Sequence, residues 1–142
     1  MNRNIYNAID LAIYIINKCI DDKETINNLQ LQAILYYIQK EYLQKYDRPI
    51  FYDVIEAWKF GPVVPNVFYK YCGFGATPIS WELDKFNIEY EDKEIIDFII
   101  ESKRKLYPWQ LFDKITSPNS PWDLIYNKEK GNEREIPIYL IK

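Results

Sequence analysis

Histidine is absent from the 142-residue sequence, which also contains only two cysteines and four glycines. Without histidine the chain cannot form a Ser-His or Cys-His catalytic pair, and it lacks the usual acid–base group near neutral pH. Cys19 and Cys72 stand far apart and outside any Cys-x-x-Cys pattern, which favours reduced, unpaired thiols. We therefore expect no catalytic site and do not expect an enzyme.

Phosphate-binding loops and metal-binding patterns are missing as well. Gly73-Phe74-Gly75 is too short to cradle phosphates, and no Walker-type or Gly-x-Gly-x-x-Gly loop occurs. Asp21, Asp22 and Glu24 could hold a hard cation, but the spacing of a calcium-binding loop does not follow, so a solvated connection is the favoured interpretation. We expect no cofactor and no metal.

No apolar run reaches the ~20 residues of a membrane span. The N-terminus also lacks the apolar core of a secretory signal. These two absences predict a cytoplasmic protein with no membrane partner.

An excess of positive charge is likewise lacking, because 18 Lys and Arg residues face 21 Asp and Glu residues, for a net charge of −3. Nucleic-acid binders usually draw most of their affinity from basic residues, so direct nucleic-acid binding is not expected. The one basic run, Lys103-Arg104-Lys105, is better explained as a solvated helix end that complements the helix dipole.

Hydrophobic residues make up 48% of the chain and aromatic residues 17%. This composition and length predict a single domain, residues 1–142, with one core. Residues 29–39 (LQLQAILYYIQ) are apolar on almost every face of a helix, interrupted by Gln30, Gln32 and Gln39. A helix of that kind normally lies at the centre of a bundle, so residues 27–45 are predicted to form a central helix, with Ile34 and Leu35 buried.

Apolar residues at helical spacing and turn residues between them predict the remaining elements. Further helices are expected at residues 4–20, 52–59, 64–71, 91–106, 108–115 and 120–127, and residues 136–141 as a short helix or an edge strand. Residues 76–90 are predicted to be an irregular or extended arm with room for a short strand pair. The fold class is mainly α: a compact helical domain of about six to seven helices around a central hydrophobic helix.

Several short motifs occur in a fixed order along this chain. They are Leu31-Gln32, Leu35-Tyr36-Tyr37, the segment Ala57-Trp58-Lys59-Phe60-Gly61-Pro62-Val63, and Ser120-Pro121-Trp122. This succession resembles the Panacea domain family, the SocA- or GepA-like proteins of bacteria and phages. The sequence departs from the family pattern at Gln30 and Ala33, where lysines are common, and at Thr116-Ser117, where the pattern has Thr-His.

The resemblance implies an antitoxin-like role, because family members are best known as antitoxins paired with varied toxins, and one delivers its toxin to a protease. The preferred hypothesis is a non-enzymatic domain that neutralises a protein partner by direct binding. The alternative is a phage or mobile-element inhibitor of a host defence effector, of anti-CRISPR type or similar, that also acts by steric binding. A less favoured third hypothesis is a hydrolase that uses carboxylates such as Asp53 and Glu56.

Partner binding is predicted at two segments with exposed groups, the arm and the turn after residue 116. The predicted contacts are Trp81, Phe86, Ser117, Asn119 and Ser120. The motif residues are assigned a structural role instead; these are Trp58, Gly61, Pro62, Val63, Pro121 and Trp122. Gly61-Pro62 is interpreted as a helix stop, and Trp122 is expected to pack inward.

Overall fold

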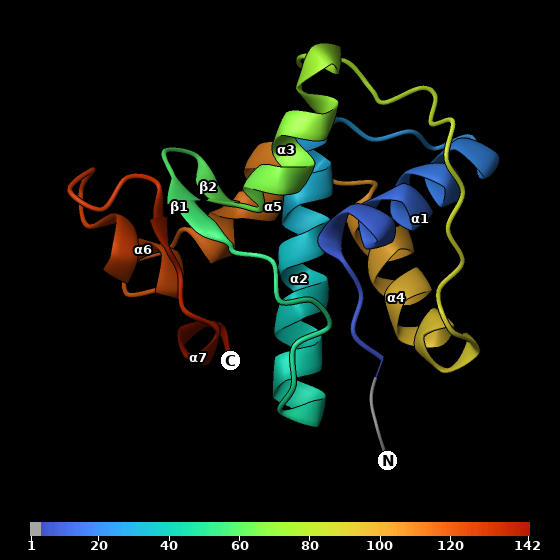
Figure 1. Ribbon diagram of the computed structural model, residues 1–142. Helices are drawn as coiled ribbons and strands as arrows, with labels where there is room; N and C mark the ends of the chain where they lie inside the picture. Colours follow the sequence, from blue (N-terminus) through green and yellow to red (C-terminus); the bar gives the residue numbers. More distant parts are fainter. Residues whose placement is uncertain (1–3) are drawn as a thin grey trace.

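Helix α2 (Asn28–Tyr46) forms the axis of the molecule, and most other helices lie around it (Figure 1). The computed structural model describes residues 4–142. Its other elements are α1 (Ala8–Asp21), β1 (Glu56–Trp58), β2 (Gly61–Val63), α3 (Pro65–Tyr71), the 3-10 turn η1 (Cys72–Phe74), α4 (Tyr90–Lys103), α5 (Pro108–Ile115), α6 (Pro121–Tyr126), β3 (Arg134–Glu135) and α7 (Ile138–Ile141). The mainly α fold with a few short strands is as predicted.

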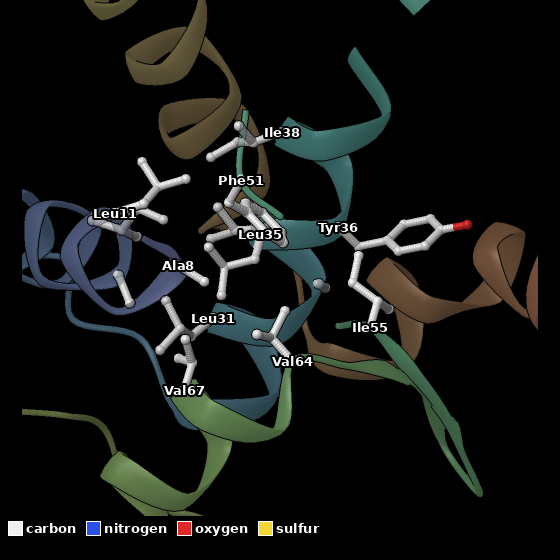
Figure 2. Packing of buried hydrophobic residues seen from close by; sticks show 14 of the residues in the cluster. Ala8, Leu11, Leu31, Leu35, Tyr36, Ile38, Phe51, Ile55, Val64 and Val67 are labelled. Carbon is white, nitrogen blue, oxygen red and sulfur yellow. The ribbon is translucent and has the colours of Figure 1, made fainter. Parts of the chain in front are cut away.

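The central helix is confirmed, and its bounds agree with the prediction to within one residue. Asn27 begins it with a capping box, in which its side chain accepts from the Gln30 backbone N–H at 2.9 Å and the Gln30 side chain accepts from the Asn27 N–H at 2.8 Å. Ile34 and Leu35 are fully buried. Figure 2 shows Leu31, Leu35 and Ile38 packed against residues from α1, α3 and the link before β1.

Two glutamines of α2 are buried and bind backbone groups of neighbouring segments. The Gln39 amide donates to the Phe51 carbonyl at 2.8 Å and accepts from the Ile50 N–H at 2.9 Å. Gln32 accepts from the Val64 N–H at 2.9 Å. Extended chain beside a helix has no ladder partner of its own, so these side chains satisfy its polar groups. Gln32 and Gln39, two of the glutamines that interrupt the apolar run, therefore attach the following segments to the central helix.

The helix predicted at residues 52–59 is wrong, because this segment enters a β-hairpin. Strands β1 and β2 pair antiparallel, with Glu56 opposite Val63 and Trp58 opposite Gly61, and β3 adds to the other edge of β1. An isolated helix of about two turns is unstable, whereas the hairpin gains ladder bonds on both sides of β1. Gly61-Pro62 accordingly lies within a strand and is not a helix stop.

The first helix starts at Ala8, four residues later than predicted. Tyr6 instead forms a parallel bridge with Phe51, and its backbone N–H donates to the Ile50 carbonyl at 2.8 Å. The Asp53 carboxylate accepts from the Ala8 N–H at 2.9 Å, which satisfies an otherwise free N–H of the first turn. These contacts come from residues more than forty positions away, so the local pattern could not indicate them.

Residues 76–89 form the predicted irregular arm, without a strand; the strand pair lies in the hairpin instead. The arm runs from η1 across α1 to α4 (Figure 1). Ile79 and Ile88 are buried, and the Ile79 N–H donates to the Ile26 carbonyl at 2.8 Å. The final segment, which the sequence left open between helix and strand, forms the short helix α7.

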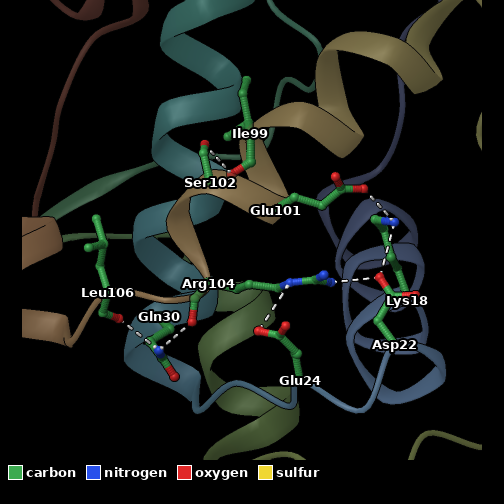
Figure 3. A network of polar contacts seen from close by, with 9 residues as sticks. All are labelled: Lys18, Asp22, Glu24, Gln30, Ile99, Glu101, Ser102, Arg104 and Leu106. Carbon is green, nitrogen blue, oxygen red and sulfur yellow. Dashed lines mark hydrogen bonds and ion pairs between the residues drawn. The ribbon is translucent and has the colours of Figure 1, made fainter.

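A polar network joins the ends of α1 and α4 (Figure 3). Arg104 Nη1 lies 2.7 Å from Asp22 Oδ2, and Lys18 Nζ lies 3.2 Å from Asp22 Oδ2 and 3.0 Å from Glu101 Oε2. The Arg104 side chain is only 8% exposed. The interpretation of residues 103–105 as a solvated helix end is therefore wrong for Arg104. Glu101 at the end of α4 pairs with Lys18 of α1.

The pairing predicts how stability depends on pH. The hydrogen bond from Arg104 and that from Lys18 lower the pKa of the Asp22 carboxyl below its ordinary 3.8. A carboxylate whose pKa is lower in the folded state stabilises the fold above its unfolded pKa, and loses that effect as the pH falls through its folded pKa. The stability difference between wild type and Asp22→Asn should therefore be present at about pH 6 and shrink below about pH 4. Urea melts across this range measure it, and a difference that stays constant would contradict the assignment.

Among residues 4–142, no helix is both long and apolar enough to cross a membrane.

Candidate partner-binding site

The two tryptophan motifs meet in space although 64 positions separate them. Trp122 Nε1 donates to the Trp58 carbonyl at 2.7 Å, and the Trp122 ring stacks on Tyr126 with centroids 4.6 Å apart. Trp58 in turn packs edge-on against Phe68 of α3 at 5.0 Å. These contacts attach α6 to the hairpin.

Gly61 allows the hairpin to approach α5 closely. Its φ of +154° lies outside the range that side chains favour, and a Cβ there would stand 2.5 Å from Cδ1 of Phe112. Pro62 and Val63 beside it are buried in β2. The glycine is therefore required by the approach of an aromatic ring.

Replacing Gly61 by alanine should lower the free energy of unfolding by about 1–3 kcal/mol, because the methyl group displaces the Phe112 ring. Gly73→Ala is the matched control, since nothing lies within 4 Å of a Cβ at that glycine. The double variant Gly61→Ala/Phe112→Leu should lose less free energy of unfolding than the two single variants lose together, because the smaller side chain at position 112 relieves the clash. Strict additivity in a double-mutant cycle would show that the ring is not the cause.

The turn between α5 and α6 is held by its own side chains. Ser117 Oγ donates to the Lys114 carbonyl at 2.7 Å. Ser120 caps α6, with Oγ accepting from the Asp123 N–H at 3.2 Å, and the Asn119 N–H donates to Asp123 Oδ2 at 2.9 Å. The predicted contacts Ser117 and Ser120 thus have local bonds, while Asn119 is exposed with a left-handed backbone, φ +68°.

This turn forms one wall of a hollow of about 300 Å³. The opposite wall comes from α2, with Tyr36, Tyr37 and Lys40, and Lys114 at the end of α5 lies between them. The Tyr37 hydroxyl donates to the Leu111 carbonyl at 2.9 Å, and Lys103 Nζ lies 4.3 Å from the centroid of its ring. Hence three predicted contact residues, Ser117, Asn119 and Ser120, line a single concave site.

Tyr36, like Tyr37, Lys40 and Lys114, lines this site but was not among the contacts predicted from the sequence. Tyr36 as a whole is only 3% exposed, but its hydroxyl oxygen is not closed off from solvent, and it makes no hydrogen bond with residues 4–142. Figure 2 shows the ring directed away from the hydrophobic cluster around Leu35. Burial raises its pKa well above the ordinary value of a tyrosine, so the group stays a protonated donor. Its place inside an apolar run concealed it as one more core residue.

The other predicted contacts lie on the arm and are not part of the lining of this hollow. Trp81 is 59% exposed and rests against Phe74, with ring centroids 5.5 Å apart. Phe86 is half-buried and packs edge-on against Tyr6 at 5.9 Å. The structure therefore separates the five predicted residues into two surfaces, and Phe86 belongs partly to the core.

A family model described as the SocA-like antitoxin, Panacea domain, matches residues 31–123. The chain belongs to this family. Among curated proteins, this chain is similar to "Antitoxin SocA" of Caulobacter vibrioides (strain NA1000 / CB15N), at 29% identity over 114 residues. That alignment covers 72% of this chain and 61% of the relative, so the chain spans about three fifths of the relative's length. No solved structure matches it.

The matched region extends from α2 to the start of α6, so both tryptophan motifs and the whole lining of the hollow fall inside the Panacea domain. Ser117 is part of that lining.

The carboxylates of the hydrolase hypothesis have structural partners in this Panacea domain. Asp53 accepts from the Ala8 N–H and from Asn66 Nδ2 at 3.1 Å, and Glu56 Oε1 accepts from Trp58 Nε1 at 2.9 Å. No group of three or more metal-ligating side chains occurs within residues 4–142. The structure thus gives both carboxylates roles in holding α1 and the hairpin.

Proposed function

We propose that this protein is an antitoxin that neutralises a protein toxin by binding it directly, without catalysis. Membership in the SocA-like antitoxin family carries the proposal. The structural bonds of Asp53 and Glu56 favour it over a carboxylate-dependent hydrolase. The hollow beside α2 supports it too, because a concave site with unused donors on a rigid helix suits the recognition of another protein.

Co-expression tests this function. Each gene that flanks the coding gene is expressed from an inducible promoter, alone and together with this protein. We expect one neighbour to arrest growth alone and to be tolerated in the presence of this protein. The two purified proteins should form a stable complex by size-exclusion chromatography. If no neighbour is toxic, or if protection occurs without a complex, direct neutralisation of a paired toxin is wrong. A purified complex with a host defence effector would support the mobile-element alternative instead.

Trp81 on the arm is a predicted partner contact outside the hollow. If this ring anchors the partner, Trp81→Ala should weaken the complex by about 2 kcal/mol or more while the melting midpoint changes little. Trp109→Ala is a matched control, because Trp109 is also exposed, at 69%, but lies on α5. Calorimetric titration and thermal melts of both variants give the comparison. Lost stability with unchanged affinity would assign Trp81 to the fold.

A further inference from the structure

The hollow beside α2 combines groups that all favour a negatively charged acceptor. Lys40 follows Tyr36 by one helical turn on α2, and Lys114 stands on the wall formed by α5. No ion pair engages either lysine among the described residues. No Asp or Glu lines the hollow. Two lysines and a hydroxyl without a hydrogen-bond partner in residues 4–142 therefore line one hollow that has no carboxylate in its lining.

The Tyr36 hydroxyl is the decisive feature, because Tyr36 lines the hollow and its hydroxyl makes no hydrogen bond with any residue of 4–142. The neighbouring Tyr37 shows the contrast, since its hydroxyl donates to a backbone carbonyl. A phenylalanine at position 36 would fill the same space without offering a donor. An open donor that points into a hollow is thus suited to an acceptor that arrives with a ligand.

We propose that this hollow binds a carboxylate of the partner protein, with Tyr36 donating a hydrogen bond and Lys40 and Lys114 supplying the charge. The volume of about 300 Å³ admits one side chain or one chain end and not an extended ligand. A nucleic acid would need several phosphate contacts, which two lysines on a chain of net charge −3 do not offer. The assignment of the carboxylate to a protein rests on the proposed function.

Titration of the intact protein with sodium propionate tests the pocket without any partner. In ¹⁵N-resolved NMR spectra, propionate should cause saturable shifts confined to the hollow, at Lys40 and residues 114–120, and propionamide should cause none. Tyr36→Phe and Lys114→Gln should each weaken propionate binding about tenfold. Lys105→Gln, an exposed lysine outside the hollow, is the charge-matched control. Shifts spread over all surface lysines, or equal shifts with inorganic phosphate, would overturn a carboxylate site.

Two peptides distinguish the sources of the carboxylate. Ac-Gly-Glu-Gly-NH₂ carries only a side-chain carboxylate, and Ac-Gly-Gly-Gly-OH carries only a terminal one. Preferential binding of the first indicates an acidic side chain of the partner, and preferential binding of the second indicates its C-terminus. If neither peptide binds, the hollow does not take a polypeptide carboxylate.

The same variants separate this inference from the function itself. If the toxin complex forms and Lys40→Gln/Lys114→Gln weakens it more than about tenfold, both proposals stand. If the complex forms with unchanged affinity, the antitoxin function stands and the carboxylate pocket is wrong as a partner site. If no complex forms, the function fails, while the propionate titration still decides whether the hollow binds a carboxylate. Tyr36→Phe should keep its melting midpoint, which shows that any loss is not due to unfolding.

Discussion

Replacing Leu35 by alanine is expected to lower the free energy of unfolding by about 2–5 kcal/mol. Leu35 is fully buried at the centre of α2, and the cluster around it contains residues from α1, α3 and the segment before β1. The loss has two parts, the transfer free energy of the removed carbons and the cavity they leave. Because a domain of this size has a total stability of about 5–15 kcal/mol, the variant should melt at clearly lower denaturant concentration. Urea unfolding followed by circular dichroism measures it.

The matched control is Leu83→Ala on the arm, where the side chain is 84% exposed. It should change stability by less than about 0.5 kcal/mol. Ile34→Ala should behave like Leu35→Ala, since Ile34 is equally buried in the same helix. Shifts below about 0.5 kcal/mol for both core variants would place α2 at the periphery, in conflict with its position in Figure 1.

The second large effect is expected for Gln39→Leu, although leucine is apolar and similar in size. The substitution removes both hydrogen bonds of the Gln39 amide and leaves the Ile50 N–H and the Phe51 carbonyl buried without partners. Each unsatisfied buried group costs about 1–3 kcal/mol, so the free energy of unfolding should fall by about 2–6 kcal/mol. Amide hydrogen exchange provides a direct readout, because the Ile50 N–H should lose its protection.

Gln44→Leu serves as the control on the same helix, since Gln44 is exposed. A hydrophobicity scale alone would rank both substitutions as equally favourable. Little or no loss in Gln39→Leu would mean that water or a shifted backbone satisfies the two groups, and the glutamine would then not determine the path of residues 50–51. Equal losses in the two variants would point to a general effect of leucine on α2.

Helices were predictable wherever local signals agreed with one another. Residues 108–115 form α5 with the predicted bounds, because Pro108 is favourable in a first turn and apolar residues recur at helical spacing behind it. Ser120 before Pro121 marks the start of α6 for the same kind of reason, a cap followed by a preorganised first position. Such signals act within a few residues, so they are complete in the sequence.

The candidate site was predictable only in part. The turn residues Ser117, Asn119 and Ser120 were selected as exposed polar groups, and they do line one hollow. Tyr36 was not selected, because nothing local separates a tyrosine whose hydroxyl is bonded, such as Tyr37, from one whose hydroxyl is open. That difference depends on which carbonyl of α5 lies nearby after folding.

By itself the sequence determined a mainly helical domain, the central position of residues 27–45 and the family motifs. Only the tertiary structure decided the β-hairpin at residues 56–63, the burial of Gln32, Gln39 and Arg104, and the meeting of Trp58 with Trp122. The physical reason is the range of the interactions. Helix periodicity and capping act within about four residues. A strand or a buried polar side chain is stabilised by a partner tens of residues away, and that partner exists only once the chain has folded.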